Sequence, residues 1–323
     1  MSKTTTLTVE RWENSLAVRI PAAHRELALS RAYGAPKERT MGQCVSCGGR
    51  LEPVRKYDFK SDAFRKVYSD RHVYSCVECG LSQTDVSKIS EGALSGYYRA
   101  EYRAVAQIGV GDPGHRWYRA RATALAMLAA EHLPRSPARV FELGAGYGYN
   151  LLAVKELYPA AQLFTDELDE TVTLPEAINR AELSEGVYDV VILSHVLEHF
   201  TDPKRLIRSA LNALTPGGVV IIEVPNDVPG IFPLNGPDEP HLTFFTAQTL
   251  MALLGSSAVF GAGPRYQRKT LYMSSRRFAS RLVRRMPVLS KLVARRQTRV
   301  VSPESFSVRR SDGVFLRAVL LNK

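Results

Sequence analysis

The sequence predicts an α/β fold with a parallel sheet covered on both faces, and the stretch 139–225 carries the two observations behind this prediction. First, strand-like segments alternate with helical ones, starting with the strand RVFEL, a glycine-rich loop and the helix NLLAVKELY. Second, the segments YDVVILS and VVIIEVP are almost wholly apolar, which is typical of strands buried between two layers of helices. All four cysteines lie upstream in two C-x-x-C pairs, which indicates a separate small module.

Hydrophobic periodicity places the other elements. A helix is expected from Trp117 to Leu133, because apolar side chains recur there at helical spacing and Pro134 and Pro137 follow. Beyond the glycine loop we expect, in order, the strands AQLFTDE and YDVVILS, the helix DPKRLIRSALNAL, the turn TPGG, the strand VVIIEVP, a helix at 247–254, the stretch VFGAG and the strand GVFLRAVLL. The predicted parts are an N-terminal arm (1–43), a cysteine-bearing module (44–95), linker helices (96–137) and the α/β domain (138–323), with a basic helical insertion at 265–310.

Positive charge is concentrated in the stretch 265–310. This stretch has a formal charge of +13. Because the whole chain has a formal charge of +11, the remaining residues together carry −2. As a helix, SSRRFASRLVRRMPVLSKLVARR has an apolar stripe bordered by arginines, interrupted near Pro287. This pattern predicts contact with an anionic membrane surface or with a phosphate-bearing substrate, and a helix packed on the sheet is the alternative.

The N-terminal residues give a weaker signal. Residues 4–20 alternate as two short strands do, and LTVERWENSLAVRIP resembles the first hairpin of the swapped-hairpin antitoxins that bind DNA as dimers. Glu13 stands where those proteins have a turn glycine, so a plain arm is the other interpretation. Since the sequence has neither an apolar run of about 18 residues nor a secretory leader, we expect a cytoplasmic protein with at most peripheral membrane contact.

The loop Glu142-Leu-Gly144-Ala-Gly146-Tyr-Gly148 lies between an apolar strand and a helix. Glycines at such a turn let a ligand approach the backbone, and the start of the helix offers unpaired N–H groups. Asp166 and Glu167 end the next strand, where a carboxylate can accept hydrogen bonds from ribose hydroxyls. The pattern predicts a nucleotide-like ligand.

The G-x-G-x-G spacing after an acid resembles the first motif of the class I S-adenosylmethionine (SAM)-dependent methyltransferases, and the resemblance continues through YDVVILSHVLEHFTDP and LTPGGVVIIEVPN. It implies a Rossmann-like domain that binds SAM through Glu142 at the methionine amino end and Glu167 at the ribose. The other expected cofactor-binding residues are Gly144, Gly146, Gly148 and Ser194. Only 21 residues separate Glu167 from Asp189, fewer than the family uses to reach its third strand, so the adenine contact is not assigned.

Three histidines are candidates for the methyl acceptor side. His195 and His199 flank Val-Leu-Glu just past the fourth strand, at the edge where open α/β sheets bind ligands, and His241 lies in the loop PDEPHLTFFT. Because an imidazole can take a proton near neutral pH, we expect His195, His199 and His241 to be catalytic. The alternatives are that His199 caps the following helix and that His241 stabilises its loop.

The cysteine pairs Cys44/Cys47 and Cys76/Cys79 lie 28 residues apart, and Gly48 and Gly80 follow the second cysteine of each pair. Four thiolates in two such turns can surround a zinc ion tetrahedrally. A closed set of four ligands predicts a structural zinc, and a redox dithiol is the competing interpretation.

The cysteine module also resembles that of the zinc-containing sugar methyltransferases, in which a tyrosine-rich stretch follows, as Tyr97, Tyr98 and Tyr102 do here. The His241 loop is similar to the H-E-H-L-x-x-F-S segment of the deoxysugar C-methyltransferases among them. Pro240 replaces their acid and Glu239 their first histidine, which favours oxygen over carbon methylation.

The expected function is SAM-dependent methyl transfer to a hydroxyl of a saccharide or glycoconjugate precursor. Three alternatives stay open. One is a small-molecule or quinone-type O-methyltransferase, which LEHFTDP also suits. Another is a nucleic-acid methyltransferase, favoured by the cysteine module and the basic stretch, although no Asn-Pro-Pro-Tyr-like motif follows the fourth strand. The last is a non-catalytic binding protein that keeps the cofactor fold.

Overall fold

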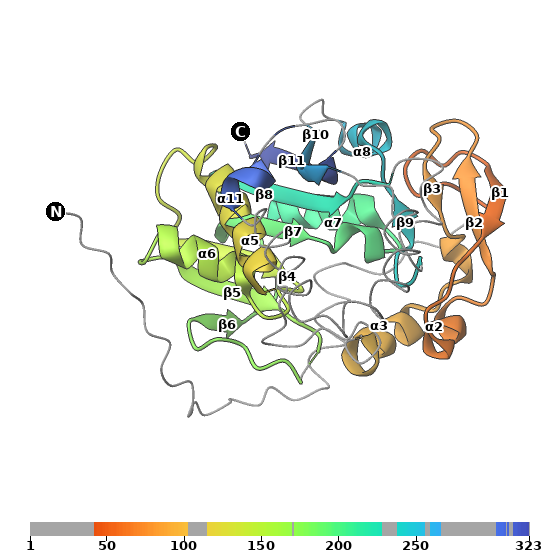
Figure 1. The fold of residues 1–323 in the computed structure, drawn as a ribbon, viewed down its shortest axis with the longest axis horizontal. Coiled ribbons are helices and arrows are strands. Elements are labelled where there is room, and N and C mark those ends of the chain that lie inside the picture. Colours follow the sequence, from red (N-terminus) through yellow and green to blue (C-terminus); the bar gives the residue numbers. More distant parts are fainter. Residues whose placement is uncertain are drawn as a thin grey trace, which may run out of the picture.

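The computed structural model describes residues 42–102, 115–169, 171–227, 238–255, 259–265, 302–307, 309 and 313–322. Within these residues a large central sheet carries helices, and a small sheet lies at one side of it (Figure 1). The N-terminal arm with its predicted hairpin, and most of the basic insertion, lie outside the described residues.

The described part of the large sheet has seven strands in the order β10-β11-β8-β7-β4-β5-β6. Their bounds are β4 (Arg139–Leu143), β5 (Gln162–Asp166), β6 (Ile178–Arg180), β7 (Tyr188–Ser194), β8 (Leu214–Pro225), β10 (Phe260–Arg265) and β11 (Gly313–Leu321). The neighbours from β6 to β8 pair in parallel, and β11 runs antiparallel to both β8 and β10. The predicted α/β fold with a central parallel sheet is confirmed.

Helices cover both faces of this sheet. On one face, α5 (His115–Ala130) and α6 (Tyr149–Leu157) pack on alternate strand residues such as Val140. On the other face, α7 (Pro203–Asn212) and α8 (Ala247–Leu254) pack on the strand residues in between, such as Phe141. This is why the central strands are apolar throughout instead of alternating.

The structure differs from the sequence prediction at the start of β8. The segment TPGG, expected as a turn, belongs to the strand, and the pairing with β7 shifts there: Tyr188 opposes Leu214 and Val190 opposes Val219. A Cβ on Gly218 would lie 3.0 Å from the carbonyl oxygen of Asp189, so a residue without a side chain suits this close approach.

The small sheet has the order β1-β2-β3-β9. Its strands are β1 (Leu51–Lys56), β2 (His72–Cys76), β3 (Ser82–Gln83) and β9 (Thr243–Phe244), and near it lie α2 (Asp62–Val67), η1 (Val86–Lys88) and α3 (Glu91–Ala100). β9 comes from the segment between β8 and α8, so one sheet joins parts of the chain that are about 160 residues apart. The predicted boundaries at 44–95, 96–137 and 138–323 stay a prediction.

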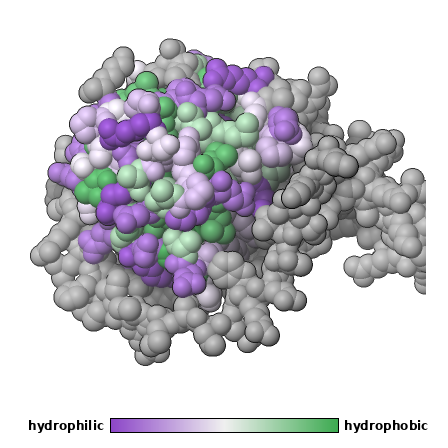
Figure 2. Space-filling model, turned by 90° about the vertical axis from the view of Figure 1, so that its left-hand side faces the viewer, coloured by the Kyte–Doolittle hydropathy of each residue, from purple (hydrophilic) through white to green (hydrophobic). Residues whose placement is uncertain are grey.

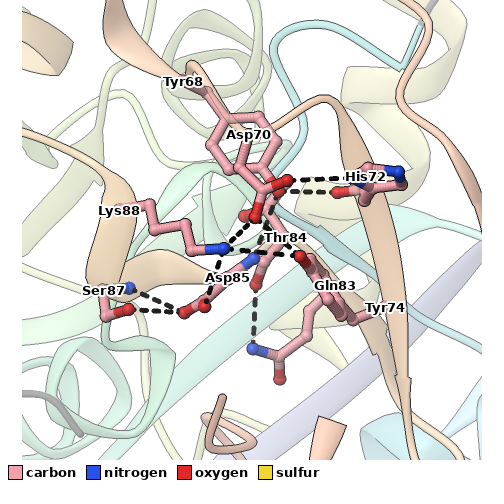
Figure 3. Close-up of polar contacts among 9 residues, drawn as sticks. All are labelled: Tyr68, Asp70, His72, Tyr74, Gln83, Thr84, Asp85, Ser87 and Lys88. Atoms are coloured by element: carbon pink, nitrogen blue, oxygen red, sulfur yellow. Dashed lines mark hydrogen bonds and ion pairs between the residues drawn. The ribbon is translucent and has the colours of Figure 1, made fainter. Parts of the chain in front are cut away.

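A polar network fixes η1 against β2 (Figure 3). The carboxylate of Asp70 accepts a hydrogen bond from Tyr74 Oη at 2.6 Å and also pairs with the side chains of His72 and Lys88. Asp85 caps η1 by accepting from the backbone N–H and the hydroxyl of Ser87. These contacts hold the start of the segment that leads into α3.

The described ends of the basic insertion are anchored on the large sheet. β10 ends at Arg265, and α11 (Pro303–Ser307) buries Phe306 against α5 and Phe315 of β11. On the face turned toward the viewer in Figure 2, hydrophobic residues form only small separate areas on the coloured part of the surface. Among the described residues, no helix combines the length and apolarity needed to cross a bilayer.

Candidate active site

The glycine loop joins β4 to α6 at the carboxyl edge of the large sheet. Gly144, Gly146 and Gly148 all have positive φ angles, of 60°, 58° and 77°, a region that favours glycine. Gly148 is the N-cap of α6, and a Cβ there would lie 2.3 Å from Cδ1 of Ile178. The three glycines have no side chain that would keep a ligand away from the backbone of this loop.

Glu142 lies beside the loop, near the end of β4, and is 2% exposed. Its Oε1 accepts a hydrogen bond from Asn150 Nδ2 at 2.6 Å, whereas its Oε2 is buried and has no hydrogen-bond partner among the described residues. Burial raises the pKa of Glu142 to about 8, although the hydrogen bond from Asn150 acts in the opposite direction. A buried carboxylate oxygen without a partner fits a cationic ligand group such as an ammonium.

The other predicted cofactor residues lie at the same edge of the sheet. Glu167 follows β5, and its Oε2 accepts a hydrogen bond from the backbone N–H of Gly146 at 2.7 Å. Ser194 ends β7, and its hydroxyl accepts a hydrogen bond from Arg121 Nη2 at 2.7 Å. The carboxylates of Glu142 and Glu167, together with the glycine loop, therefore fit a ligand with one cationic end and vicinal hydroxyls.

Asp189 lies at the opposite edge of the sheet. It accepts hydrogen bonds from the backbone N–H groups of Ala138 and of Arg139, the first residue of β4, and from the hydroxyl of Thr215. The short β6 provides the third strand, because its three residues suffice to pair with Leu163–Thr165 of β5.

The structure brings two of the predicted histidines together. His199 lies in η2 (Leu197–His199), directly after β7, and its ring centroid is 5.0 Å from that of His241, which precedes β9. His199 Nδ1 lies 3.3 Å from the carbonyl oxygen of Pro240. His195 also lies near Glu198, with Nδ1 3.5 Å from Oε1, and is the one described non-glycine residue with a positive φ, of 54°.

Burial controls the charge of the three histidines and of Glu198. It lowers the pKa of His199 to about 3, with the nearby His241 adding to the effect, and it lowers the pKa of His241 to about 4. Burial, together with Arg121, also holds the pKa of His195 well below its usual range. The imidazoles are therefore neutral at pH 7. The carboxyl of Glu198 is fully buried, and burial raises its pKa to about 8.

Tyrosines from α3 and just beyond it line the same place. The rings of Tyr98 and Tyr102 lie edge-on to His199, at centroid distances of 5.7 and 6.5 Å. The hydroxyl of Tyr98 is buried and has no hydrogen-bond partner among the described residues. The hydroxyl of Tyr97 instead donates to Glu239, which also accepts from the backbone and hydroxyl of Ser61. Glu239 therefore has a structural role.

The sequence prediction missed a buried charge cluster behind the site. Glu223 of β8 is fully buried between Arg121 and Arg317, whose Nε atoms donate to its two oxygens at 2.5 and 2.6 Å. Burial alone would raise the pKa of Glu223, but the two arginines hold it below its ordinary value. The signal was present, because VVIIEVP and FLRAVLL each hold one charge in an apolar strand.

The four cysteines form one cluster, as the spacing predicts. Their Sγ atoms lie within 4.8 Å of one another, at 3.6 Å between Cys44 and Cys79 and 3.4 Å between Cys47 and Cys76. Tetrahedral zinc with Zn–S bonds of about 2.3 Å separates its ligands by about 3.8 Å, so the donor set fits that ion. Backbone N–H groups of Ser46 and Gly49 donate to Cys44 and Cys47, as in knuckle turns.

The strand order, the antiparallel β11 between β8 and β10, and the glycine loop after the central strand define the Rossmann-like architecture of the class I methyltransferases. Residues 115–257 match the model of the family described as "Methyltransferase domain", a match that spans less than half of the chain. This part of the chain is therefore similar to methyltransferase domains, and its fold is consistent with that of the SAM-dependent class.

Similarity to known proteins is low. No curated protein matches the chain. Among solved structures, a SAM-dependent methyltransferase from Thermotoga maritima, described as a possible histamine N-methyltransferase, is 15% identical with a TM-score of 0.39, over 64% of this chain and 93% of that one. The plantazolicin methyltransferase bound to SAH is 16% identical with a TM-score of 0.41, over 71% of this chain and 94% of that one.

Proposed function

We propose that the protein transfers a methyl group from SAM to a hydroxyl oxygen, and that Glu142 and the glycine loop hold the cofactor. The single observation that carries this proposal is the buried, half-paired carboxylate of Glu142 beside three left-handed glycines. Its unpaired oxygen suits the ammonium of the methionine end, and Glu167 suits the ribose hydroxyls. When bound, SAM supplies an electrophilic methyl group, and transfer is an in-line displacement that depends mainly on alignment.

On the acceptor side, His199 and His241 are the proposed groups that orient the hydroxyl. Their neutral imidazoles each offer a nitrogen lone pair, and Tyr98 and Tyr102 add aromatic faces next to them. Aromatic rings beside hydrogen-bonding groups suit a sugar, whose ring has apolar C–H faces and polar edges. We therefore propose a saccharide or glycoconjugate precursor as the acceptor, with His195, whose Nδ1 is 3.5 Å from Glu198 Oε1, as a third group near this pair.

The test of this function combines binding with transfer. Calorimetry with SAH measures the cofactor site alone, and labelled SAM offered with nucleotide-sugars, phenols or RNA identifies the acceptor class. We expect SAH binding and label transfer to a nucleotide-sugar or other saccharide. Label on phenols or RNA alone would contradict the saccharide proposal, and absence of SAH binding would contradict the cofactor proposal.

Alanine at Gly148 is expected to weaken SAH binding by at least tenfold. The new Cβ would overlap Ile178, and relieving such an overlap costs about 1–3 kcal/mol or displaces the start of α6. Gly186 is the matched control, because its φ is 66° but nothing lies within 4 Å of its Cβ position. Calorimetry of Gly148→Ala and Gly186→Ala should separate the overlap from the cost of the left-handed backbone, and equal affinities in the two variants would contradict this role.

The affinity for SAH is expected to rise with pH, by about tenfold between pH 7 and 8.5. The pKa of Glu142 is raised to about 8 by burial, so below that pH its carboxyl must lose a proton before it can pair with the ligand's ammonium. Well above pH 8 the carboxylate is mostly ionised and the rise should level off. Calorimetry across this range should show the rise in the native protein and a flat profile in Glu142→Gln; the same rise in both would assign it to another group.

Zinc is the ion that we propose for the four cysteines, in a structural role, since four thiolates leave no open coordination position. We also propose that the segment 265–310 contacts an anionic surface or a substrate phosphate. Apart from Arg265, 302–307 and Arg309, it lies outside the described residues. Salt-sensitive sedimentation with anionic vesicles tests this, and equal sedimentation with neutral vesicles would contradict it.

A further inference from the structure

A second group of metal-binding side chains lies next to the proposed acceptor site. One carboxylate oxygen of Glu198 and one ring nitrogen each of His199 and His241 lie within 4.8 Å of one another. Glu198 is fully buried, and neither of its oxygens has a hydrogen-bond partner among the described residues. Because a buried carboxylate without partners is costly, this arrangement favours a cation between the three side chains.

The distances suit an ion better than direct hydrogen bonds. His199 Nε2 is 3.8 Å and His195 Nδ1 is 3.5 Å from Glu198 Oε1, both beyond the usual length of a hydrogen bond. Ligand atoms at about 2.1 Å from a common ion are separated by about 3.0–4.2 Å. Small side-chain movements would therefore bring Glu198, His199 and His241 to ligand distances.

Neighbouring contacts orient the ring of His199 and hold the backbone of Glu198 and His241. The carbonyl oxygen of Pro240 can only accept, so Nδ1 of His199 carries the proton and Nε2 presents its lone pair on the side of Glu198. The backbone N–H of Leu242 donates to the carbonyl oxygen of Glu198 at 2.8 Å, which ties the His241 segment to η2. Tyr57 donates to the carbonyl oxygen of His241 at 2.9 Å and fixes that residue from the small sheet.

We propose that Glu198, His199 and His241 bind a divalent first-row transition ion. Two imidazoles and a carboxylate suit Zn²⁺, Co²⁺ or Fe²⁺, whereas the four thiolates of the cysteine cluster form a separate, closed site. Three protein ligands leave coordination positions for oxygen atoms of another molecule. The identification of this molecule as the methyl acceptor rests on the proposed function. The metal site itself does not depend on it.

Cobalt titration of the full-length, zinc-loaded protein tests the site, because the cysteines are then occupied and Co²⁺ reports its ligands by absorption. We expect one Co²⁺ per chain, without the strong near-ultraviolet band of thiolate ligation. Glu198→Gln and His241→Ala should each weaken binding by at least tenfold. His72→Ala is the matched control, since His72 also contacts a carboxylate, that of Asp70, but on the surface.

Two outcomes would overturn the proposal: no saturable Co²⁺ binding beyond the cysteine cluster, or equal binding by the native protein and Glu198→Gln. Unchanged SAH binding in the two variants serves as the check that they are folded. Glu198→Asp is a further variant that keeps the charge, and it should bind Co²⁺ more tightly than Glu198→Gln. A protein that binds Co²⁺ as expected but never binds SAH would contradict the proposed function and leave the metal site standing.

Discussion

Replacing Cys47 and Cys79 together by serine is expected to unfold the small sheet and to abolish methyl transfer. The proposed zinc is the reason: binding to four cysteines contributes about 10–16 kcal/mol, as much as the whole stability of an ordinary domain. Cys47 is exposed and Cys79 partly exposed, so their packing contributes little by itself. A large loss of stability in this variant would therefore report the metal.

Transfer should be lost because the small sheet positions His241. β3 pairs with β9, and the backbone N–H of Thr84 donates to the carbonyl oxygen of Leu242, directly after His241. Without β1 to β3 this segment loses its partner strand, and His241 no longer lies beside His199. The glycine loop depends on β4, β5 and α6 instead, so SAH binding should persist.

The measurements are zinc content, thermal unfolding, SAH calorimetry and methyl transfer. Val77→Ser is the matched control, because Val77 lies in the same turn as Cys79 and is 47% exposed. It should keep both zinc and activity. If the double serine variant lacked zinc but unfolded at the same temperature as the native protein, the structural role of the ion would be wrong.

The sequence predicted the large sheet well because its strands are buried on both faces. A segment such as YDVVILS is apolar throughout, and β7 covers the same residues, Tyr188–Ser194. Two short strands, β6 and β9, were missed. β6 has three residues and β9 has two, which is too few for periodicity to identify, and β9 is a strand only because β3 lies beside it.

The candidate site was predictable in part for the same reason. The position of Glu142 and Glu167 follows from the strand ends, since parallel strands all end at one edge of the sheet. The proximity of His199 and His241 depends on how the loop after β8 returns to η2, which no local pattern encodes. Glu198 was not predicted as a site residue, because no local pattern in the sequence shows that it is completely buried.

Truncation of Glu223 to alanine is expected to lower the free energy of unfolding by about 3–5 kcal/mol. Arg317 is 1% exposed, lies opposite Glu223 in the β8–β11 ladder and donates a hydrogen bond to its carboxylate. The change removes this carboxylate and leaves Arg317 buried without it. Arg121 is less affected, because it also donates to Ser194 and its side chain is 12% exposed. Urea-induced unfolding of Glu223→Ala measures the loss.

Two variants separate the unpaired charge from the lost side-chain volume. Glu223→Met combined with Arg317→Met removes both charges and keeps apolar bulk, so most of the stability should return. Glu156→Ala breaks the exposed pair with Arg119, whose side chains are 59% and 58% exposed, and should cost at most about 1 kcal/mol. If the double methionine variant were as unstable as Glu223→Ala, the loss would come from packing and not from Arg317 left buried without its counter-charge.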